Sequence, residues 1–323
     1  MNLSEYWKKL TEVEFSELRQ LRFPSDCYAE LYMALDHENR RSLILYIPKN
    51  LLNYFATIQQ ESFANISIEF KLLRPHGGIV ITLINPLLSE IFDDLIYSLY
   101  NKIYTEENSK AYISIFLNYY RKWSGLFEPL SDTKLSKAEI KGLIGEMIIL
   151  EGLLKNPTYC NNETINGWHG PYGDEKDFFV DDNIIEVKAI STSSNEVSIS
   201  SEYQLERVSK RKFFLALVEL NEKQTGLNIQ QKLFQLRDII NKHNLDFAAL
   251  LTALKQNKIN QSNISEYDDY KYEFSRVCFY DANAEDFPSI TKSQIANPIK
   301  NVHYNIDLSM ISNYRVETNL LAI

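Results

Sequence analysis

Two acids and a lysine, Asp177, Glu186 and Lys188, lie within twelve residues of one another and could act on a phosphodiester. The sequence around them predicts a β-hairpin, with strands at residues 178–180 and 184–190 joined by a turn at residues 181–183. Because side chains alternate along a strand, Glu186 and Lys188 should share one face. Two carboxylates beside an ammonium can bind a hard divalent cation and act on the water next to it.

An acid two residues before a lysine is not specific in itself, because the spacing recurs at Glu69, Asp132, Glu139, Asp174 and Asp269. None of those five combines an apolar strand, a preceding turn and an acid opening the partner strand. The alternative interpretation of Glu186 and Lys188 is the solvated face of an amphipathic hairpin, since charged cross-strand neighbours are common.

A helix upstream offers a third carboxylate. Ser136 and Glu139 form the sequence pattern of a capping box, which marks a helix start. The apolar residues that follow have helical spacing and predict a buried stripe: Ile140, Leu143, Ile144, Met147 and Ile148. Glu146 falls at the margin of this stripe, as a carboxylate reaching into a cleft would. It could equally be an ordinary exposed acid, and Glu151 lies nearer the centre of the stripe.

These features together resemble the PD-(D/E)XK nuclease superfamily. More narrowly, the chain is similar to a family of uncharacterised bacterial PD-(D/E)XK proteins associated with restriction and phage defence. The matching segments are Gly142-Leu-Ile-Gly-Glu146, Gly167-Trp-His-Gly-Pro171, Lys176-Asp177-Phe178, Ile185-Glu-Val-Lys188 and Gln204-Leu205, with weaker similarity at Phe287-Pro-Ser-Ile and Tyr304-Asn-Ile-Asp. Lys176 stands where the superfamily has its eponymous proline.

The resemblance implies an α/β (α+β) fold: a restriction-endonuclease-like core with a mixed central sheet flanked by helices, plus an N-terminal α/β extension. It implies a Mg²⁺-dependent DNA endonuclease of restriction or defence type, with Mn²⁺ able to substitute. Asp177 and Glu186 would bind the metal with the Val187 carbonyl, and Lys188 would orient the attacking water. Glu146 would bridge to the metal through water or hold a second ion. The alternative is a catalytically idle nuclease fold that binds DNA or assembles a defence complex.

The bulk composition limits the class of protein. The net charge of −9 argues against nonspecific coating of DNA, although a nuclease needs only a local basic surface. The three cysteines, Cys27, Cys160 and Cys278, have no zinc-ligand spacing. The first nine residues contain no long apolar segment, so no signal peptide is expected. No apolar run reaches membrane-spanning length, and a cytoplasmic location without membrane contact is expected.

The best candidate for DNA contact is the basic cluster Arg207, Lys210, Arg211 and Lys212. A solvated helix end is the competing interpretation, since a helix C-terminus favours basic residues. Gln204 could orient a water or a phosphate, or could begin the helix expected from Ser201. His169, in the glycine-rich loop at residues 166–173, could act at the cleft rim, although a loop that packs Trp168 is the commoner case.

Along the chain we expect an N-terminal α/β region at residues 1–128, for DNA or partner contact, and a nuclease-like domain at residues 129–323. A helix near residues 5–21 should precede strands at 42–46, 66–72 and 78–83 and helices at 87–104 and 110–126. The apolar segment 213–220 should be a central strand of the mixed sheet. Helices at 229–242 and 246–256 and strands near 271–280 and 302–306 should follow.

The sequence has no P-loop, G-x-S-x-G, H-E-x-x-H or EF-hand pattern. Expected partners are DNA, a methyltransferase, ATPase or helicase of the same system, and a second copy of the chain.

Overall fold

The computed structural model describes residues 3–13, 18–23, 27–52, 61–73, 76–130, 134–208 and 210–322, with the backbone alone at residues 61–62. The chain forms two compact units, Met1–Ser131 (unit 1) and Asp132–Ile323 (unit 2).

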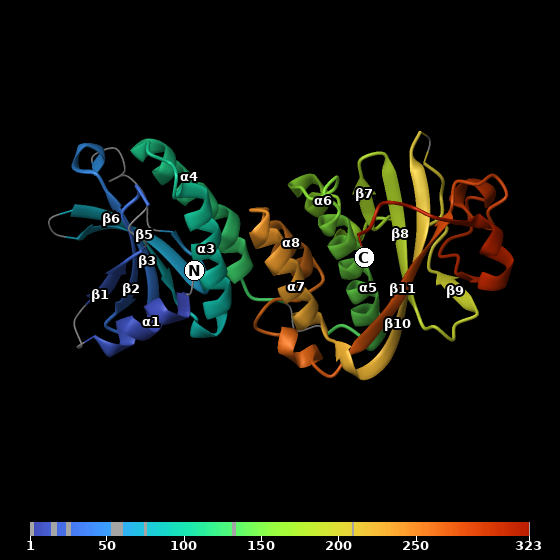
Figure 1. The fold of residues 1–323 in the computed structure, drawn as a ribbon, viewed down its shortest axis with the longest axis horizontal. Helices are drawn as coiled ribbons and strands as arrows, with labels where there is room; N and C mark the ends of the chain where they lie inside the picture. The colour runs from blue at the N-terminus through green and yellow to red at the C-terminus, as the bar shows by residue number, and fades with distance from the viewer. Residues whose placement is uncertain are drawn as a thin grey trace. The chain divides into compact units, whose positions relative to one another are not determined.

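Unit 1 contains an antiparallel sheet with the strand order β1-β2-β3-β6-β5-β4. The strands are β1 (Leu18–Arg22), β2 (Leu31–Asp36), β3 (Arg41–Ile47), β4 (Glu61–Ser62), β5 (Ile66–Leu73) and β6 (His76–Leu83). Three helices lie beside the sheet: α1 (Leu3–Glu12), α3 (Ser89–Ile103) and α4 (Ser109–Ser124) (Figure 1). Leu43, Leu45 and Ile81 share one face of the sheet and are fully buried in the core of unit 1. Ile44 and Val80, on the opposite face, belong to a smaller buried cluster.

The prediction of one helix over residues 5–21 is wrong at its C-terminal end. Helix α1 ends at Glu12, and Leu18–Arg22 is strand β1, paired antiparallel with β2; residues 14–17 lie outside the described residues. The apolar residues of this segment fit a helical spacing as well as a strand. Pairing with β2 favours the strand, and no local feature of the sequence indicates that pairing.

Unit 2 is built on a five-stranded mixed sheet with the order β13-β11-β10-β8-β7. Its strands are β7 (Phe178–Val180), β8 (Asn183–Ile190), β10 (Lys212–Leu227), β11 (Tyr272–Asp281) and β13 (Arg315–Val316). Strand β10 lies parallel to β8 and antiparallel to β11. The prediction of a central apolar strand in a mixed sheet is therefore confirmed.

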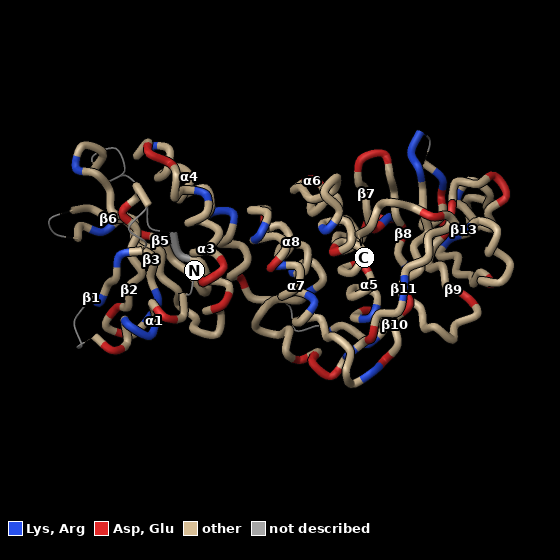
Figure 2. The backbone as a smooth tube through the Cα atoms, in the orientation of Figure 1, with Lys and Arg blue, Asp and Glu red and all other residues tan. Residues whose placement is uncertain are grey.

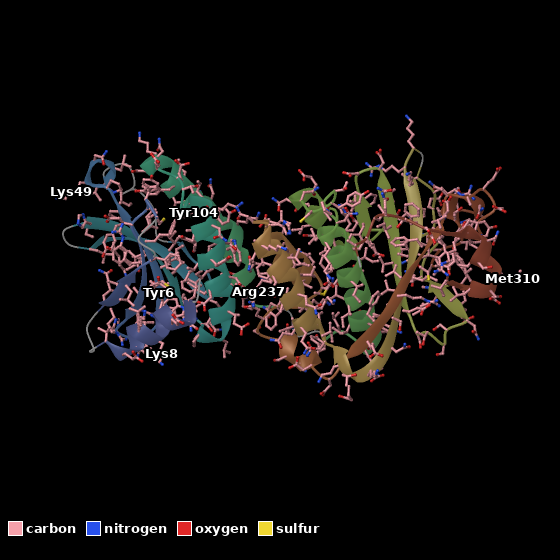
Figure 3. All side chains as sticks on the ribbon, viewed as in Figure 1. Tyr6, Lys8, Lys49, Tyr104, Arg237 and Met310 are labelled. Carbon is pink, nitrogen blue, oxygen red and sulfur yellow. The ribbon has the colours of Figure 1, made fainter. Side chains whose placement is uncertain are left out.

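Two layers cover this sheet, and side chains fill the space between them and the sheet (Figures 1 and 3). On one side lie α5 (Lys137–Lys155), α7 (Ile229–Lys242) and α8 (Phe247–Gln256), with the short α6 (Asn162–Asn166). On the other side lie the C-terminal segments and a two-stranded sheet of β9 (Glu196–Ile199) and β12 (Tyr304–Asp307). Its residues Val197, Ile199 and Ile306 share a buried cluster with Leu215 and Leu217 of β10.

Helix α5 begins as the sequence predicts. Ser136 accepts a hydrogen bond from the Glu139 N–H, and the Glu139 carboxylate accepts one from the Ser136 N–H, which completes the capping box. The five apolar residues of the predicted stripe are all buried. Helix α7 spans the predicted residues 229–242, and a second capping box, Asn228 with Gln231, fixes its start.

The helix expected from Ser201 is also wrong. Residues 202–205 form turns, and the chain then enters β10 at Lys212. Two carbonyls of this segment, those of Tyr203 and Gln204, accept hydrogen bonds from Lys176 Nζ. A helix would direct those carbonyls along its own axis, so the contact with a distant lysine favours the turns. Across the described residues, no helix is both long and apolar enough to cross a membrane.

Candidate active site

The hairpin of β7 and β8 places Asp177 beside an open strand edge. Strand β7 is short, and its pairing with β8 ends where Phe178 faces Ile185. The N–H of Val187, two residues further along β8, therefore has no strand partner on this side, and the Asp177 carboxylate accepts its hydrogen bond at 2.6 Å. One oxygen of Asp177 is thus fixed by the main chain of the strand that carries Glu186 and Lys188.

Glu186 and Lys188 share one face of β8, as the alternation predicts. Lys188 Nζ lies 2.7 Å from Glu186 Oε1, and the two side chains are 17% and 2% exposed. The pair is therefore largely withdrawn from water, which removes the interpretation as a solvated hairpin face. The second carboxylate oxygen, Glu186 Oε2, is buried and has no hydrogen-bond partner among the residues that the structure describes.

Glu146 comes to the same place from helix α5. The preceding residue, Gly145, faces the sheet, where an added β-carbon would lie 3.1 Å from the Ala189 β-carbon. Glycine therefore lets α5 approach β8 closely enough for the next side chain to reach the strand edge. Glu146 Oε2 accepts a hydrogen bond of 2.7 Å from the indole N–H of Trp168, which is fully buried.

The loop that contains Trp168 fastens both acids. Its Trp168 pairs with Phe178 in an isolated antiparallel bridge and stacks on that ring, with 6.2 Å between centroids. The next two N–H groups, of His169 and Gly170, donate to the Asp177 carbonyl at 2.7 and 3.1 Å. A β-carbon at Gly170 would overlap Glu146 Oε2 and lie 2.8 Å from Asp177 Oδ1. The two carboxylates therefore face each other across a position that only glycine can occupy.

The pKa values of the three carboxyl groups are raised. Burial, and then the charge of Asp177, raise the pKa of Glu186 to about 8, against the opposing effect of Lys188. The same two causes raise the pKa of Glu146 well above its usual value, and burial raises that of Asp177. Burial would lower the pKa of Lys188, but the carboxylates around it raise that pKa overall, so the lysine is a cation at neutral pH.

When all three acids are ionised they carry a charge of −3, against the ammonium groups of Lys188 and Lys176, which both act on Asp177 and Glu186. A divalent cation would balance the remaining negative charge and favour the ionised acids. Hard cations such as Mg²⁺ prefer carboxylate and carbonyl oxygens, and the unpartnered Glu186 Oε2 is a buried acceptor whose unmet hydrogen bond is costly. No three His, Cys, Asp or Glu side chains in the described ranges converge as a ready-made metal cage. Each of the three acids accepts a hydrogen bond at one carboxylate oxygen from a donor of the protein. The other oxygens fit a metal site that is completed by a main-chain oxygen and water.

The rival carboxylate Glu151 does not belong to this cluster. It lies on α5 in ion pairs with Lys155 and Lys232, at 2.8 and 2.7 Å. These partners overcome the effect of its burial and lower its pKa. Glu151 therefore joins α5 to α7 in the core of unit 2.

The predicted DNA-contacting residues lie along the segment that leads into β10, where Lys and Arg positions gather (Figure 2). Arg207, Lys210, Arg211 and Lys212 are all exposed. Arg207 donates to the carbonyls of Ala284 and Glu285, so part of its role is structural. Lys212 faces Asn183 at the start of β8, three residues, or about 10 Å, along the strand from Glu186. The competing interpretation, a helix end, is not found among the described residues of this segment.

Gln204 and His169 have local partners. Gln204 Oε1 accepts a hydrogen bond from the Ser200 N–H at 2.8 Å, within a turn. His169 Nδ1 lies 2.5 Å from Asp174 Oδ2, and its ring packs edge-on against Phe179. The ring is therefore oriented by an acid five positions further along the chain.

A comparison with protein families gives an independent result. A family model described as "Putative PD-(D/E)XK family member" matches residues 3–309 of the 323-residue chain. The chain belongs to this family. No curated protein and no solved structure matches it.

The family assignment bears out the resemblance and the nuclease-like fold. PD-(D/E)XK proteins are usually nucleases, and those nucleases typically use divalent metals such as Mg²⁺. Lys176-Asp177 and Glu186-Val-Lys188 are the residues that we predict to form the motif in this member. Lys176, in place of the family's proline, is 3% exposed, and its ammonium lies 4.7 Å from the centre of the Phe213 ring. By donating to the carbonyls of residues 203 and 204, it fixes these turns next to the motif.

Trp168 is the residue near the motif whose position the sequence does not predict. A tryptophan between glycines suggests only a packed loop, and its contact with Glu146 spans 22 positions of the chain. The one available signal is the segment Gly167-Trp-His-Gly, because two glycines that flank a bulky residue indicate close approach of the backbone to something else.

We expect Trp168→Phe to weaken Mn²⁺ binding by about 10- to 100-fold, the usual cost of losing an indirect partner of a metal site. The phenyl ring keeps the contact with Phe178 but cannot donate to Glu146. Calorimetric titration with Mn²⁺ measures the change. Trp123→Phe is the matched control, because Trp123 is also fully buried and its indole nitrogen has no partner among the described residues. Equal affinities in wild type and Trp168→Phe would show that the indole does not position the site.

Proposed function

We propose that this protein is a Mg²⁺-dependent DNA endonuclease of a restriction or defence system. One observation supports this most strongly: Glu186 is buried with one oxygen paired to Lys188 and the other unpartnered among the described residues, between two further carboxylates. A purely structural lysine–glutamate pair in this unit, Lys232 with Glu151, shows the opposite pattern, with both carboxylate oxygens engaged.

The residues divide the work as follows. Asp177, Glu186 and the Val187 carbonyl would hold the metal, with Glu146 reaching it directly or through water. When bound, the metal polarises the scissile phosphate and lowers the pKa of a nearby water. Lys188 then donates to oxygens that become more negative as the phosphodiester bond breaks. The Val187 N–H and the Trp168 indole keep Asp177 and Glu146 in place, so that little reorganisation accompanies the reaction.

The deciding experiment is incubation of the purified full chain with methylated and unmethylated plasmid in Mg²⁺, with EDTA as the negative control. Neighbouring methyltransferase, ATPase or helicase subunits are added in a second series. Cleavage that EDTA abolishes and Asp177→Asn removes supports the proposal. Absence of cleavage in every combination would instead favour an idle nuclease fold that binds DNA or assembles a complex.

For DNA contact we expect Lys210→Ala/Arg211→Ala to weaken binding and to reduce the slope of log affinity against log salt by about 1 for each phosphate that the variant no longer neutralises. Arg207 is left intact because it supports the carbonyls of Ala284 and Glu285. The control is Lys258→Ala/Lys300→Ala, which removes two other exposed lysines of unit 2. An unchanged salt slope in the first variant would place the DNA elsewhere.

A further inference from the structure

Unit 1 has a groove on the face of its sheet that carries polar residues. Strand registers align these side chains in rows across β3, β6 and β5. Ser42, Thr82 and Ser67 form a row of hydroxyls; Ile44, Val80 and Glu69 form the next; Tyr46, Gly78 and Lys71 form the third. The cavity above these rows measures about 770 Å³, within the range of sites for small molecules.

The floor of the groove is partly apolar and partly polar. Ile44 and Val80 are buried in a small cluster with Ala34, and Tyr32 and Tyr46 pack edge-to-face beside it, with 5.0 Å between their ring centres. Ser42 and Thr82 are buried although they are polar, and their hydroxyls lie 3.0 Å apart. A hydroxyl can donate and accept, so this pair can serve either kind of group on a ligand.

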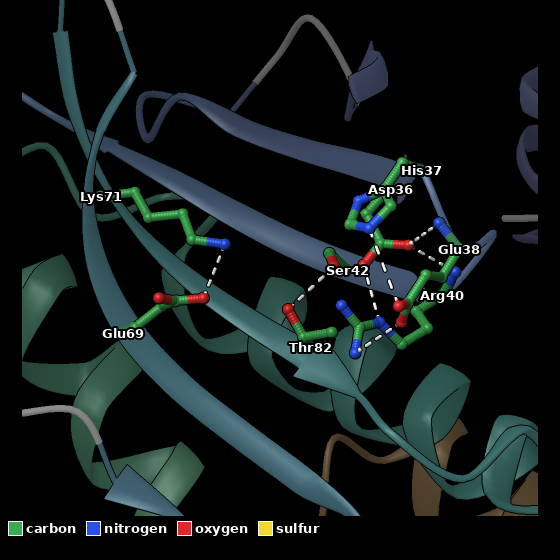
Figure 4. Close-up of polar contacts among 8 residues, drawn as sticks. All are labelled: Asp36, His37, Glu38, Arg40, Ser42, Glu69, Lys71 and Thr82. Atoms are coloured by element: carbon green, nitrogen blue, oxygen red, sulfur yellow. Dashed lines mark hydrogen bonds and ion pairs between the residues drawn. The ribbon is translucent and has the colours of Figure 1, made fainter. Parts of the chain in front are cut away.

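Ion pairs form both walls, and Ser42 and Thr82 lie between them (Figure 4). On one side Lys71 Nζ lies 2.6 Å from Glu69, and on the other Arg40 lies 2.7 Å from Asp36 and 2.9 Å from Glu38. Among the Lys, Arg, Asp and Glu residues that line the groove, Arg40 and Lys71 balance Asp36 and Glu69. Each wall pairs a cation with a carboxylate, so a phosphate would gain no net attraction, and the groove suits a neutral group that carries donors and acceptors together.

We infer that this groove binds a single nucleobase. The faces of the heterocycle would lie against Leu18 and Leu73, the partly buried apolar residues that line the groove above Ile44 and Val80, as bases do between apolar and aromatic side chains. Its edge alternates carbonyls, ring nitrogens and amino groups, which match the ammonium of Lys71, the hydroxyls of Ser42 and Thr82, and the carboxylate of Glu69. The sugar and any phosphate would remain outside the groove, toward solvent. The inference concerns unit 1 and requires no cleavage by unit 2.

Two sources could supply the base, a free nucleoside or an unpaired position in a nucleic-acid strand. The full chain in EDTA is titrated with each of the four deoxynucleosides, with their monophosphates, with a single-stranded oligonucleotide and with a blunt duplex, by calorimetry and saturation-transfer NMR. Binding of free nucleosides identifies a small-molecule source. Binding of the single strand without free nucleosides or duplex identifies an unpaired base in a strand.

The decisive variant is Ser42→Ala/Thr82→Val, which removes both partners of one hydrogen bond and leaves the packing nearly unchanged. We expect it to weaken base binding about tenfold, as loss of a hydrogen bond to a ligand does. Glu69→Gln should do the same for bases with an amino group. Glu273→Gln is its control, because it breaks an exposed lysine–glutamate pair of similar length in unit 2.

Thermal unfolding confirms that each variant is folded. If no nucleoside or strand binds the wild type, the inference is overturned. It is also overturned if bases bind but Ser42→Ala/Thr82→Val and Glu69→Gln retain full affinity.

Discussion

Replacing Lys188 with methionine is expected to slow single-turnover DNA cleavage by about a hundredfold to a thousandfold, the usual cost of losing one donor to a developing negative charge. Methionine keeps most of the apolar length of the side chain and removes its charge. The ammonium lies 2.7 Å from Glu186, and the neighbouring carboxylates keep it protonated by raising its pKa. Because its donation matters most in the transition state, substrate binding should change little.

The measurement compares wild type and Lys188→Met at saturating Mg²⁺, with DNA binding titrated separately in Ca²⁺. Lys232→Met is the control, since Lys232 also forms a buried pair of 2.7 Å with a glutamate. If Lys188 serves only stability, the two variants should lose activity in parallel with their thermal unfolding. Equal rates for wild type and Lys188→Met would falsify the catalytic assignment.

Asp177→Asn and Glu186→Gln are each expected to remove most Mn²⁺ and Mg²⁺ binding. The loss should exceed the roughly 10- to 100-fold that follows loss of an indirect partner, because these carboxylates are the predicted direct ligands. The same substitutions should stabilise the metal-free protein, since both acids have raised pKa values and are costly to bury as anions. Calorimetry and thermal unfolding in EDTA measure the two effects.

Glu151→Gln provides a control of opposite sign. Its carboxylate has a lowered pKa because Lys155 and Lys232 stabilise the anion. The substitution should therefore destabilise the protein and leave metal affinity unchanged. Metal binding that survives in both Asp177→Asn and Glu186→Gln would remove the basis for the metal site.

The raised pKa of Glu186 also sets a pH dependence. The folded, metal-free protein holds a proton on this group up to about pH 8, whereas the ordinary pKa is 4.5. Between these values the folded state binds more protons than the unfolded state, so the free energy of unfolding should fall as pH rises. Unfolding titrations in EDTA from pH 4.5 to 8 test this, and Glu186→Gln should flatten the decline. A decline that is as steep in the variant would assign it to other groups.

The sequence by itself determined the local elements that carry the motif. The Ser136–Glu139 capping box, the stripe on α5 and the alternation along β8 each depend on residues a few positions apart, so propensity and hydrogen bonding within one element decide them. The apolar run in β10 indicated a buried strand for the same reason. The proximity of Glu186 and Lys188 follows from this alternation alone.

Only the tertiary structure decided what surrounds these residues. The contact of Trp168 with Glu146, the hold of Lys176 on residues 203–204 and the pairing of β1 with β2 join residues 10 to 28 positions apart, or separate elements. Local propensity does not distinguish a helix from a strand or a turn in such segments, because the competing states differ by less than the contacts made on folding. The raised pKa values have the same origin: carboxylates from α5, the start of β7 and β8 become buried neighbours only when the chain has folded.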